Sequence, residues 1–163
     1  MNKIELIELN EFDSAMGHIY SVAVDDSDVT LYDSFLEEND TLFRPELAEI
    51  IHKLNTMSSQ TGFIDIYFKL NEGKPGDGLC AITDSKKKLR LYCIRFGNAL
   101  LVLGGGGPKS KQIRAYQEDP KLMLENMKLR AVSDAMAKAI KEKTLKIEED
   151  GSLSGLTILE KTN

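Results

Sequence analysis

Tryptophan is absent from this sequence of 163 residues, and cysteine, histidine and proline are scarce, with two, two and four residues. The cysteines, Cys80 and Cys93, stand in apolar, strand-like stretches, where a free cysteine behaves as a small core residue. We expect no structural disulfide, because no secretory signal accompanies them. Two cysteines with two distant histidines also argue against a zinc site, so neither a metal nor a cofactor is expected.

Long apolar runs are lacking as well. No stretch approaches the roughly 20 apolar residues that a membrane helix needs. The opening residues, MNKIELIELNEFD, are too acidic and too interrupted for a signal peptide. The composition, 42% hydrophobic and 29% charged, is ordinary for a soluble globular domain. We therefore expect a cytoplasmic protein with no membrane partner.

Charge is unevenly distributed along the chain. The net charge is −5, but residues 1–83 carry five basic and sixteen acidic residues, whereas residues 84–163 carry sixteen basic and ten acidic ones. The acidic total argues against a dedicated nucleic-acid binder, and the basic second half keeps that class open. A plain solvated basic face is the alternative. One hypothesis is that the acidic N-terminal segment covers the basic face within the same chain.

Hydrophobic periodicity predicts a mixture of strands and helices. No regular strand-helix alternation is present, so we expect an α+β fold with a mainly antiparallel sheet flanked by helices, in one domain spanning 1–163. Its parts are acidic N-terminal strands (1–43), a core (44–143) and a terminal hairpin (144–163). The expected strands are 4–9, 18–24, 63–69, 79–83, 89–95 and 99–103. The expected helices are 33–39, 45–61 and 120–143. The expected terminal hairpin pairs 144–148 with 156–159.

A run of four glycines, 104–107, follows the apolar stretch 99–103. The Walker pattern requires glycines where Leu103 and Pro108 stand, which excludes a P-loop NTPase. The dinucleotide fingerprint is excluded too, because it needs a parallel strand-helix unit rather than the end of a hairpin. Glycines leave a backbone able to approach another backbone, a phosphate or a base closely. The simpler interpretation is a flexible exit from the sheet.

Basic residues gather around this glycine run. Arg90 and Arg95 lie on the preceding strand, where a separation of five places them on opposite faces. Cations with an aromatic residue nearby are typical of single-stranded nucleic-acid binding, since the cations neutralise phosphates and the aromatic ring stacks on a base. The cations and the aromatic residue that follow the glycines are Lys109, Lys111, Arg114 and Tyr116.

Other catalytic or metal-binding arrangements find little support. His18 lies on an alternating strand and His52 on the polar side of a helix, and Ser110 has no nucleophile-elbow context. Asp119 precedes Pro120 and is better placed to cap a helix than to act in acid-base chemistry. The acidic stretch 25–28 lacks the spacing of a calcium loop and is typical of a turn.

The segment 89–136 resembles the RelE/HigB superfamily of bacterial toxins. The run 91–94 is similar to the aromatic central strand of that family. Gly97 and Asn98, with the run 100–103, are similar to its next strand. Residues 109–111 are similar to its basic loop. Residues 120–136 then correspond to the helix after that loop. With 45–69 included, the resemblance covers about half of the chain.

This resemblance implies a small antiparallel sheet flanked by helices and a ribosome-dependent, metal-independent cleavage of messenger RNA. It implies phosphate contacts from Lys109, Lys111 and Arg114, with Arg90 or Arg95 contributing from the strand. Tyr116 would stack on a base or handle a proton. RNA or the ribosome and an antitoxin-like protein are the expected partners. The late histidine of some members has no counterpart after His52.

Two other functional classes stay open at this point. The first is a non-catalytic protein-interaction module with a RelE-like scaffold, which the acidic net charge and the missing late histidine favour. The second is a housekeeping or mobile-element protein that makes no contact with RNA.

Overall fold

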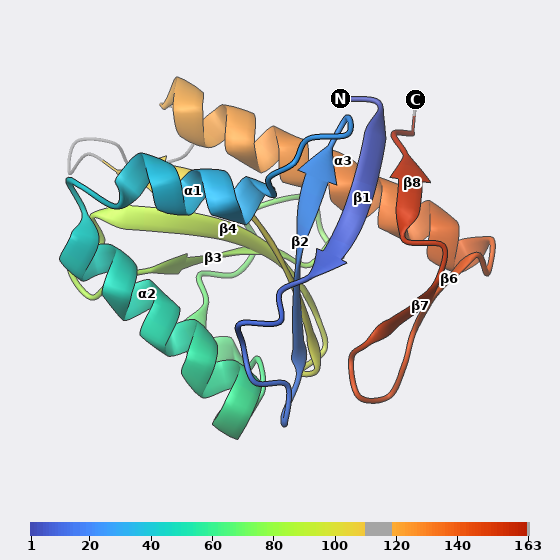
Figure 1. Cartoon of the computed structure of the whole chain (residues 1–163), viewed down its shortest axis with the longest axis horizontal. Coiled ribbons are helices and arrows are strands. Elements are labelled where there is room, and N and C mark those ends of the chain that lie inside the picture. Colours follow the sequence, from blue (N-terminus) through green and yellow to red (C-terminus); the bar gives the residue numbers. More distant parts are fainter. Residues whose placement is uncertain (110–118, 163) are drawn as a thin grey trace.

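The computed structural model describes residues 1–109 and 119–162. Within them, six strands form one sheet in the order β3-β4-β5-β2-β1-β8, and β6 and β7 form a separate two-stranded sheet (Figure 1). Neighbours in the large sheet are antiparallel except β2 and β5, which confirms the expected α+β class and mostly antiparallel sheet. The strands are β1 (Lys3–Glu8), β2 (His18–Val24), β3 (Leu79–Thr83), β4 (Leu89–Phe96), β5 (Leu100–Pro108), β6 (Leu145–Ile147), β7 (Leu153–Gly155) and β8 (Ile158–Glu160).

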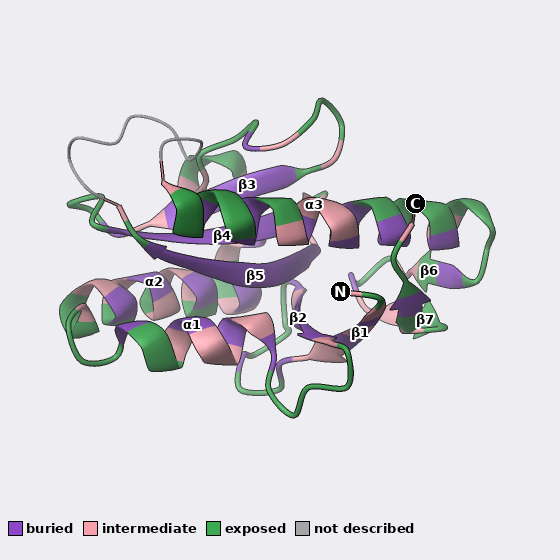
Figure 2. Cartoon of the chain, turned by 90° about the horizontal axis from the view of Figure 1, so that it is seen from above, coloured by how far each residue is buried: buried purple, intermediate pink, exposed green. Residues whose placement is uncertain are grey.

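Helices cover both faces of the large sheet (Figure 2). α3 (Pro120–Lys141) packs on one face, and α1 (Leu31–Asn39) and α2 (Arg44–Thr56) lie on the other. A π-helical turn, Met57–Thr61, continues α2. Because both faces are covered, β4 and β5 are buried along most of their length, and β5 therefore begins as a continuous apolar run without alternation.

The helix starts follow local capping rules. Thr30 accepts a hydrogen bond from the backbone of Asp33, whose carboxylate accepts one in return from the Thr30 backbone, so α1 begins with a capping box. Asp119 caps α3 as expected, accepting hydrogen bonds from the backbone amides of Lys121 and Leu122. The predicted helices are thus confirmed, with α1 starting two residues earlier than expected.

The glycine run lies inside β5 and not after it. The expectation of a flexible exit from the sheet is wrong, because 104–107 are buried and belong to a strand paired with β4. A Cβ on Gly104 would lie 3.0 Å from the side chain of Leu129 on α3, and one on Gly106 would overlap the carbonyl oxygen of Arg90. The absence of side chains therefore lets α3 and β4 approach this part of β5 closely.

The prediction of a strand at 63–69 is also wrong. The structure has a 3₁₀ turn, Asp65–Tyr67, and a single bridge between Lys69 and Ala81 of β3. A strand requires a partner along its length, and here only one residue pair is bridged. Ile66, which the alternation would have placed on a sheet, is instead 84% exposed.

The end of the chain differs in part from the expected hairpin. β6 pairs with β7, whereas β8, which overlaps the expected second arm 156–159, leaves the hairpin and pairs with β1. The hairpin loop contacts β2 through His18, whose Nε2 lies 3.4 Å from a carboxylate oxygen of Asp150. On its other side, Nδ1 of the same ring lies 2.6 Å from Oε2 of Glu8. This histidine joins two parts of the fold.

Candidate anion-binding site

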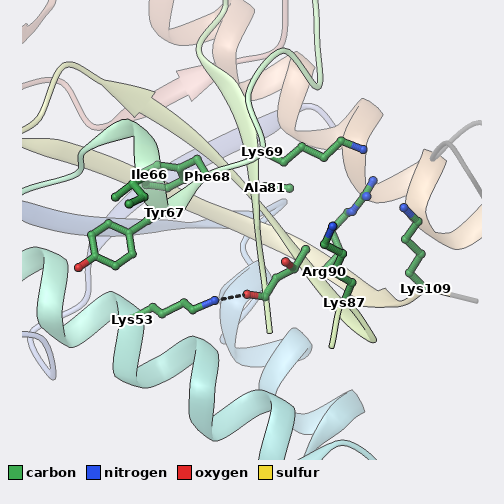
Figure 3. Close-up of a pocket in the computed structure, with 10 residues that line it drawn as sticks. Lys53, Ile66, Tyr67, Phe68, Lys69, Ala81, Lys87, Arg90 and Lys109 are labelled. Atoms are coloured by element: carbon green, nitrogen blue, oxygen red, sulfur yellow. Dashed lines mark hydrogen bonds between the residues drawn. The ribbon is translucent and has the colours of Figure 1, made fainter. Parts of the chain in front are cut away.

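A pocket of about 550 Å³ opens along the outer edge of β3 (Figure 3). Five of its lining side chains are basic and none is acidic. Residues of the 3₁₀ turn and the position after it, Ile66, Tyr67 and Phe68, form an apolar end. Such a set of like charges next to apolar walls creates a positive potential that attracts anions. The basic residues are Lys53, Lys69, Lys87, Arg90 and Lys109.

Four of these cations come from separate elements. Lys69 follows the 3₁₀ turn, Lys87 lies in the turn between β3 and β4, Arg90 is on β4 and Lys109 follows β5. In Figure 3 the ends of Lys69, Arg90 and Lys109 point toward the same space. The pairing of β3 with β4 and of β4 with β5 therefore assembles a site from residues far apart in sequence.

The turn that carries Lys87 is built on a buried carboxylate. Asp84 accepts hydrogen bonds from the backbone amides of Lys86, Lys88 and Leu89 at 3.1, 2.9 and 2.8 Å. Lys87 itself has a φ of 56°, a left-handed conformation that closes the turn. Among the described carboxylates, none forms an ion pair with Lys87, so this cation is available to a ligand.

Arg90 is the buried centre of the site, with 2% of its side chain exposed. Its Nη1 lies 3.0 Å from Oε1 of Glu72, but the N–H bond is not directed at that oxygen. Nε and Nη1 consequently have no hydrogen-bond acceptor within 1–109 and 119–162. The guanidinium also stands 5.9 Å from the ring centroid of Tyr92. Nε and Nη1 are both closed off from solvent, but the guanidinium lines the pocket and its positive charge can attract a carboxylate or a phosphate there.

Glu72 reaches Arg90 because α3 holds its loop in place. The Asn126 side chain donates a hydrogen bond to the carbonyl oxygen of Glu72 at 2.9 Å, and Ser133 Oγ donates to that of Asp77 at 3.0 Å. Both donors lie on the buried side of α3. The loop that leads into β3 thus carries one buried acidic residue, Glu72, 8% exposed at its side chain, as the counter-ion of Arg90.

Lys109 experiences the positive charge of the pocket directly. Burial, together with the charges of Arg90 and Lys69, lowers its pKa below the ordinary value of 10.5. An anion bound among these three groups would oppose that effect and raise the pKa again. The pKa of Lys109 is therefore expected to respond to a ligand in the pocket.

Lys53 forms part of the pocket wall and is already engaged. Its Nζ donates a hydrogen bond of 2.7 Å to the carbonyl oxygen of Thr83 at the edge of β3, and it lies 3.4 Å from a carboxylate oxygen of Glu49. Glu49 in turn accepts hydrogen bonds from the backbone and hydroxyl of Ser85. Lys53 thus connects α2 to the edge strand. Lys69 is engaged as well, since its Nζ lies 3.8 Å from Oε1 of Glu72.

Arg95 lies on the opposite sheet face from Arg90, as the odd separation predicts. It forms an ion pair with Asp65 in the 3₁₀ turn, and its guanidinium stands 5.6 Å from the ring centroid of Phe68. Arg95 is absent from the lining of the basic pocket. Its contacts fix the turn that forms the apolar end of that pocket.

Comparison with protein families, with curated proteins and with solved structures finds no match to this chain. No helix in the described part of the chain combines the length and the apolar character needed to cross a membrane. The same residues contain no group of three or more histidine, cysteine or acidic side chains arranged to hold a metal ion. The basic pocket is accordingly the feature on which a functional argument rests.

The structure brings together two of the expected site residues, Arg90 and Lys109. Lys111, Arg114 and Tyr116 lie outside the described residues. No described residue of the acidic segment 1–43 lines the pocket, and that segment supplies β1, β2 and α1 to the fold.

Sequence reasoning missed four residues of the site. Glu72, Lys69 and Lys53 carried no local signal, because each is a single charge in a loop or helix far from the basic segment. Lys87 could have been found, since it lies in a run of three lysines between two predicted strands.

Proposed function

We propose that the basic pocket binds phosphate groups of single-stranded RNA, and that the protein is a RelE/HigB-like toxin that cleaves messenger RNA on the ribosome without a metal. The observation that carries this proposal is the group of cations that line the pocket, in which the side chains of Lys69, Arg90 and Lys109 point toward the same space. Phosphate oxygens fit such a site because each accepts several charge-assisted hydrogen bonds.

The chemistry needed for metal-free RNA cleavage is charge stabilisation and proton transfer. Arg90 and Lys69 would stabilise the negative charge that develops on the phosphate oxygens in the transition state. Lys109, whose lowered pKa a bound phosphate would raise again, would add positive charge at the same oxygens, and a base must take the proton from the ribose 2′-hydroxyl. The leaving 5′ oxygen then needs a proton, a role for which the resemblance suggests Tyr116.

Direct binding tests the first half of the proposal. A short fluorescein-labelled single-stranded RNA is titrated with protein at several salt concentrations, and anisotropy is recorded. Four phosphate contacts, from Lys69, Lys87, Arg90 and Lys109, predict a slope of log K against log salt of about −3. Lys69→Gln should weaken binding and reduce the slope by about 1. Lys138→Gln, an exposed lysine near the far end of α3, is the matched control and should change neither.

Expression in a bacterial host tests the second half. An active toxin should arrest growth on induction, and the Lys69→Gln/Lys109→Gln double variant should relieve the arrest at an unchanged level of soluble protein. An antitoxin-like partner that neutralises the protein should compete with RNA for the pocket. Harmless expression of folded wild-type protein, together with no cleavage of ribosome-bound messenger RNA, would reject the toxin activity.

A non-catalytic interaction module is the second candidate, and one surface favours it. Met123, Leu124 and Met127 are each about half exposed on the outer side of α3. Apolar side chains grouped in this way are typical of a surface that contacts another protein. Under this alternative, Leu124→Ser/Met127→Ser would change the phenotype of expression, whereas Lys69→Gln/Lys109→Gln would leave it unaltered.

A further inference from the structure

The apolar end of the basic pocket is exposed in a way that core packing does not explain. Ile66 is 84% exposed, and Tyr67 beside it is half-buried and lines the pocket. In Figure 3 both side chains lie at the end away from Arg90 and Lys109, with Lys53 extending along the wall below them. An exposed aliphatic side chain next to an aromatic ring and a row of cations is suited to contact a flat, uncharged group attached to an anion.

The 3₁₀ turn that presents these side chains is held from both sides. Asp65 at its start pairs with Arg95, and the Arg95 guanidinium stands over the ring of Phe68 just after the turn. Lys69 is then joined to β3 by two backbone hydrogen bonds with Ala81, of 2.8 and 2.9 Å. The wall is thus preformed, and a ligand would not have to order it, which favours binding.

We propose that Tyr67, with Ile66 beside it, is a base-stacking wall, and that the pocket binds RNA with one unpaired base against this wall and the adjoining phosphate among Lys69, Arg90 and Lys109. This inference rests on the proposed RNA binding and names the part of the nucleotide that the apolar end recognises. The sugar-phosphate backbone would then follow the outer edge of β3. The π-face of any base can stack, so the contact would add affinity with little sequence preference.

An extended peptide fits the same pocket less well. A peptide that adds to a sheet edge needs free backbone groups on the edge strand. Here the amide and carbonyl groups of Ala81 are already bonded to Lys69, and the carbonyl oxygen of Thr83 accepts a hydrogen bond from Lys53. The groups that remain to bind a ligand are cations and an aromatic ring, which is the combination that single-stranded nucleic acids use.

The test compares Tyr67→Leu and Tyr67→Phe in the full-length protein. Leucine keeps the apolar packing of this half-buried side chain but removes the aromatic face, and phenylalanine keeps the face. Tyr67→Leu should weaken binding of a short single-stranded RNA about tenfold, whereas Tyr67→Phe should stay within about twofold of the wild type. An RNA of the same length carrying one abasic site at the bound position should bind wild type and Tyr67→Leu equally. Quenching of 2-aminopurine at that position should disappear in Tyr67→Leu.

Three other outcomes would decide against the stacking wall, and the last of them also against RNA binding. If wild type binds RNA in a Lys69-dependent manner but Tyr67→Leu binds equally well, the stacking wall is wrong and the RNA proposal stands. If Tyr67→Leu weakens the abasic RNA as much as the intact one, Tyr67 acts through the fold and stacking is again rejected. If wild type binds no RNA but binds an acidic peptide in a Lys69-dependent manner, both RNA binding and the stacking role of Tyr67 are rejected.

Discussion

Replacing Glu72 by glutamine should destabilise the protein strongly, because it leaves the charge of Arg90 buried without a counter-ion. The two side chains are 8% and 2% exposed, and the atoms of the pair lie 3.0 Å apart. Breaking a buried pair by removing one partner costs about 3–5 kcal/mol, and the amide oxygen of glutamine favours the lower figure of about 3 kcal/mol. For a chain of this size, the melting temperature should fall by about 6–12 °C.

Urea unfolding of four proteins measures the effect: wild type, Glu72→Gln, Arg90→Met and the double variant. The double variant should recover most of the lost stability, because removing both charges together avoids the desolvation cost that each single variant suffers. Pyrophosphate should stabilise Glu72→Gln more than wild type, since the ligand then supplies the missing anion. A loss below about 1 kcal/mol in Glu72→Gln, or additive effects in the double variant, would refute this account.

Three further outcomes are expected. Gly106→Ala should destabilise the fold by about 2 kcal/mol or more, since its Cβ would overlap the backbone of β4. Gly107→Ala is the control and should change the urea midpoint little, because the nearest atom to its Cβ would lie 3.6 Å away. RNA affinity should fall as pH rises through the lowered pKa of Lys109, because the neutral amine no longer attracts phosphate. Lys69→Gln should raise that pKa toward 10.5, because it removes a neighbouring positive charge, and NMR titration of the lysine side chains can follow the change. Cys93 should resist iodoacetamide until the protein is unfolded, because burial raises the pKa of its thiol, and mass spectrometry checks this.

The elements that the sequence predicts well are those whose signals are local. The bounds of β2 and β3 follow from short apolar stretches between turn residues, and the start of α3 from Asp119 and Pro120. The prediction of a strand at 63–69 was wrong because alternation describes a side-chain pattern and does not show whether a partner strand is present. The position of 104–107 inside β5 was not predictable, because the close approach of α3 to these glycines arises only from tertiary packing.

The candidate site was predictable in part for a similar reason. Arg90 and Lys109 belong to the basic half of the chain, so charge pattern alone points to them. Burial of Arg90 and its pairing with Glu72 depend on a loop that α3 holds against the sheet. Lys69 reaches the pocket through one backbone bridge to β3, which no periodicity could indicate.

The pairing of β8 with β1 has a consequence for synthesis of the chain. Ile4 lies opposite Leu159, so the outer edge of β1 stays without a partner until the last strand has left the ribosome. The β3-β4-β5 meander, which carries the basic pocket, is complete about fifty residues earlier. An unpaired strand edge is a template for intermolecular association. Ribosome-stalled or prematurely terminated chains that lack β8 should therefore aggregate through β1.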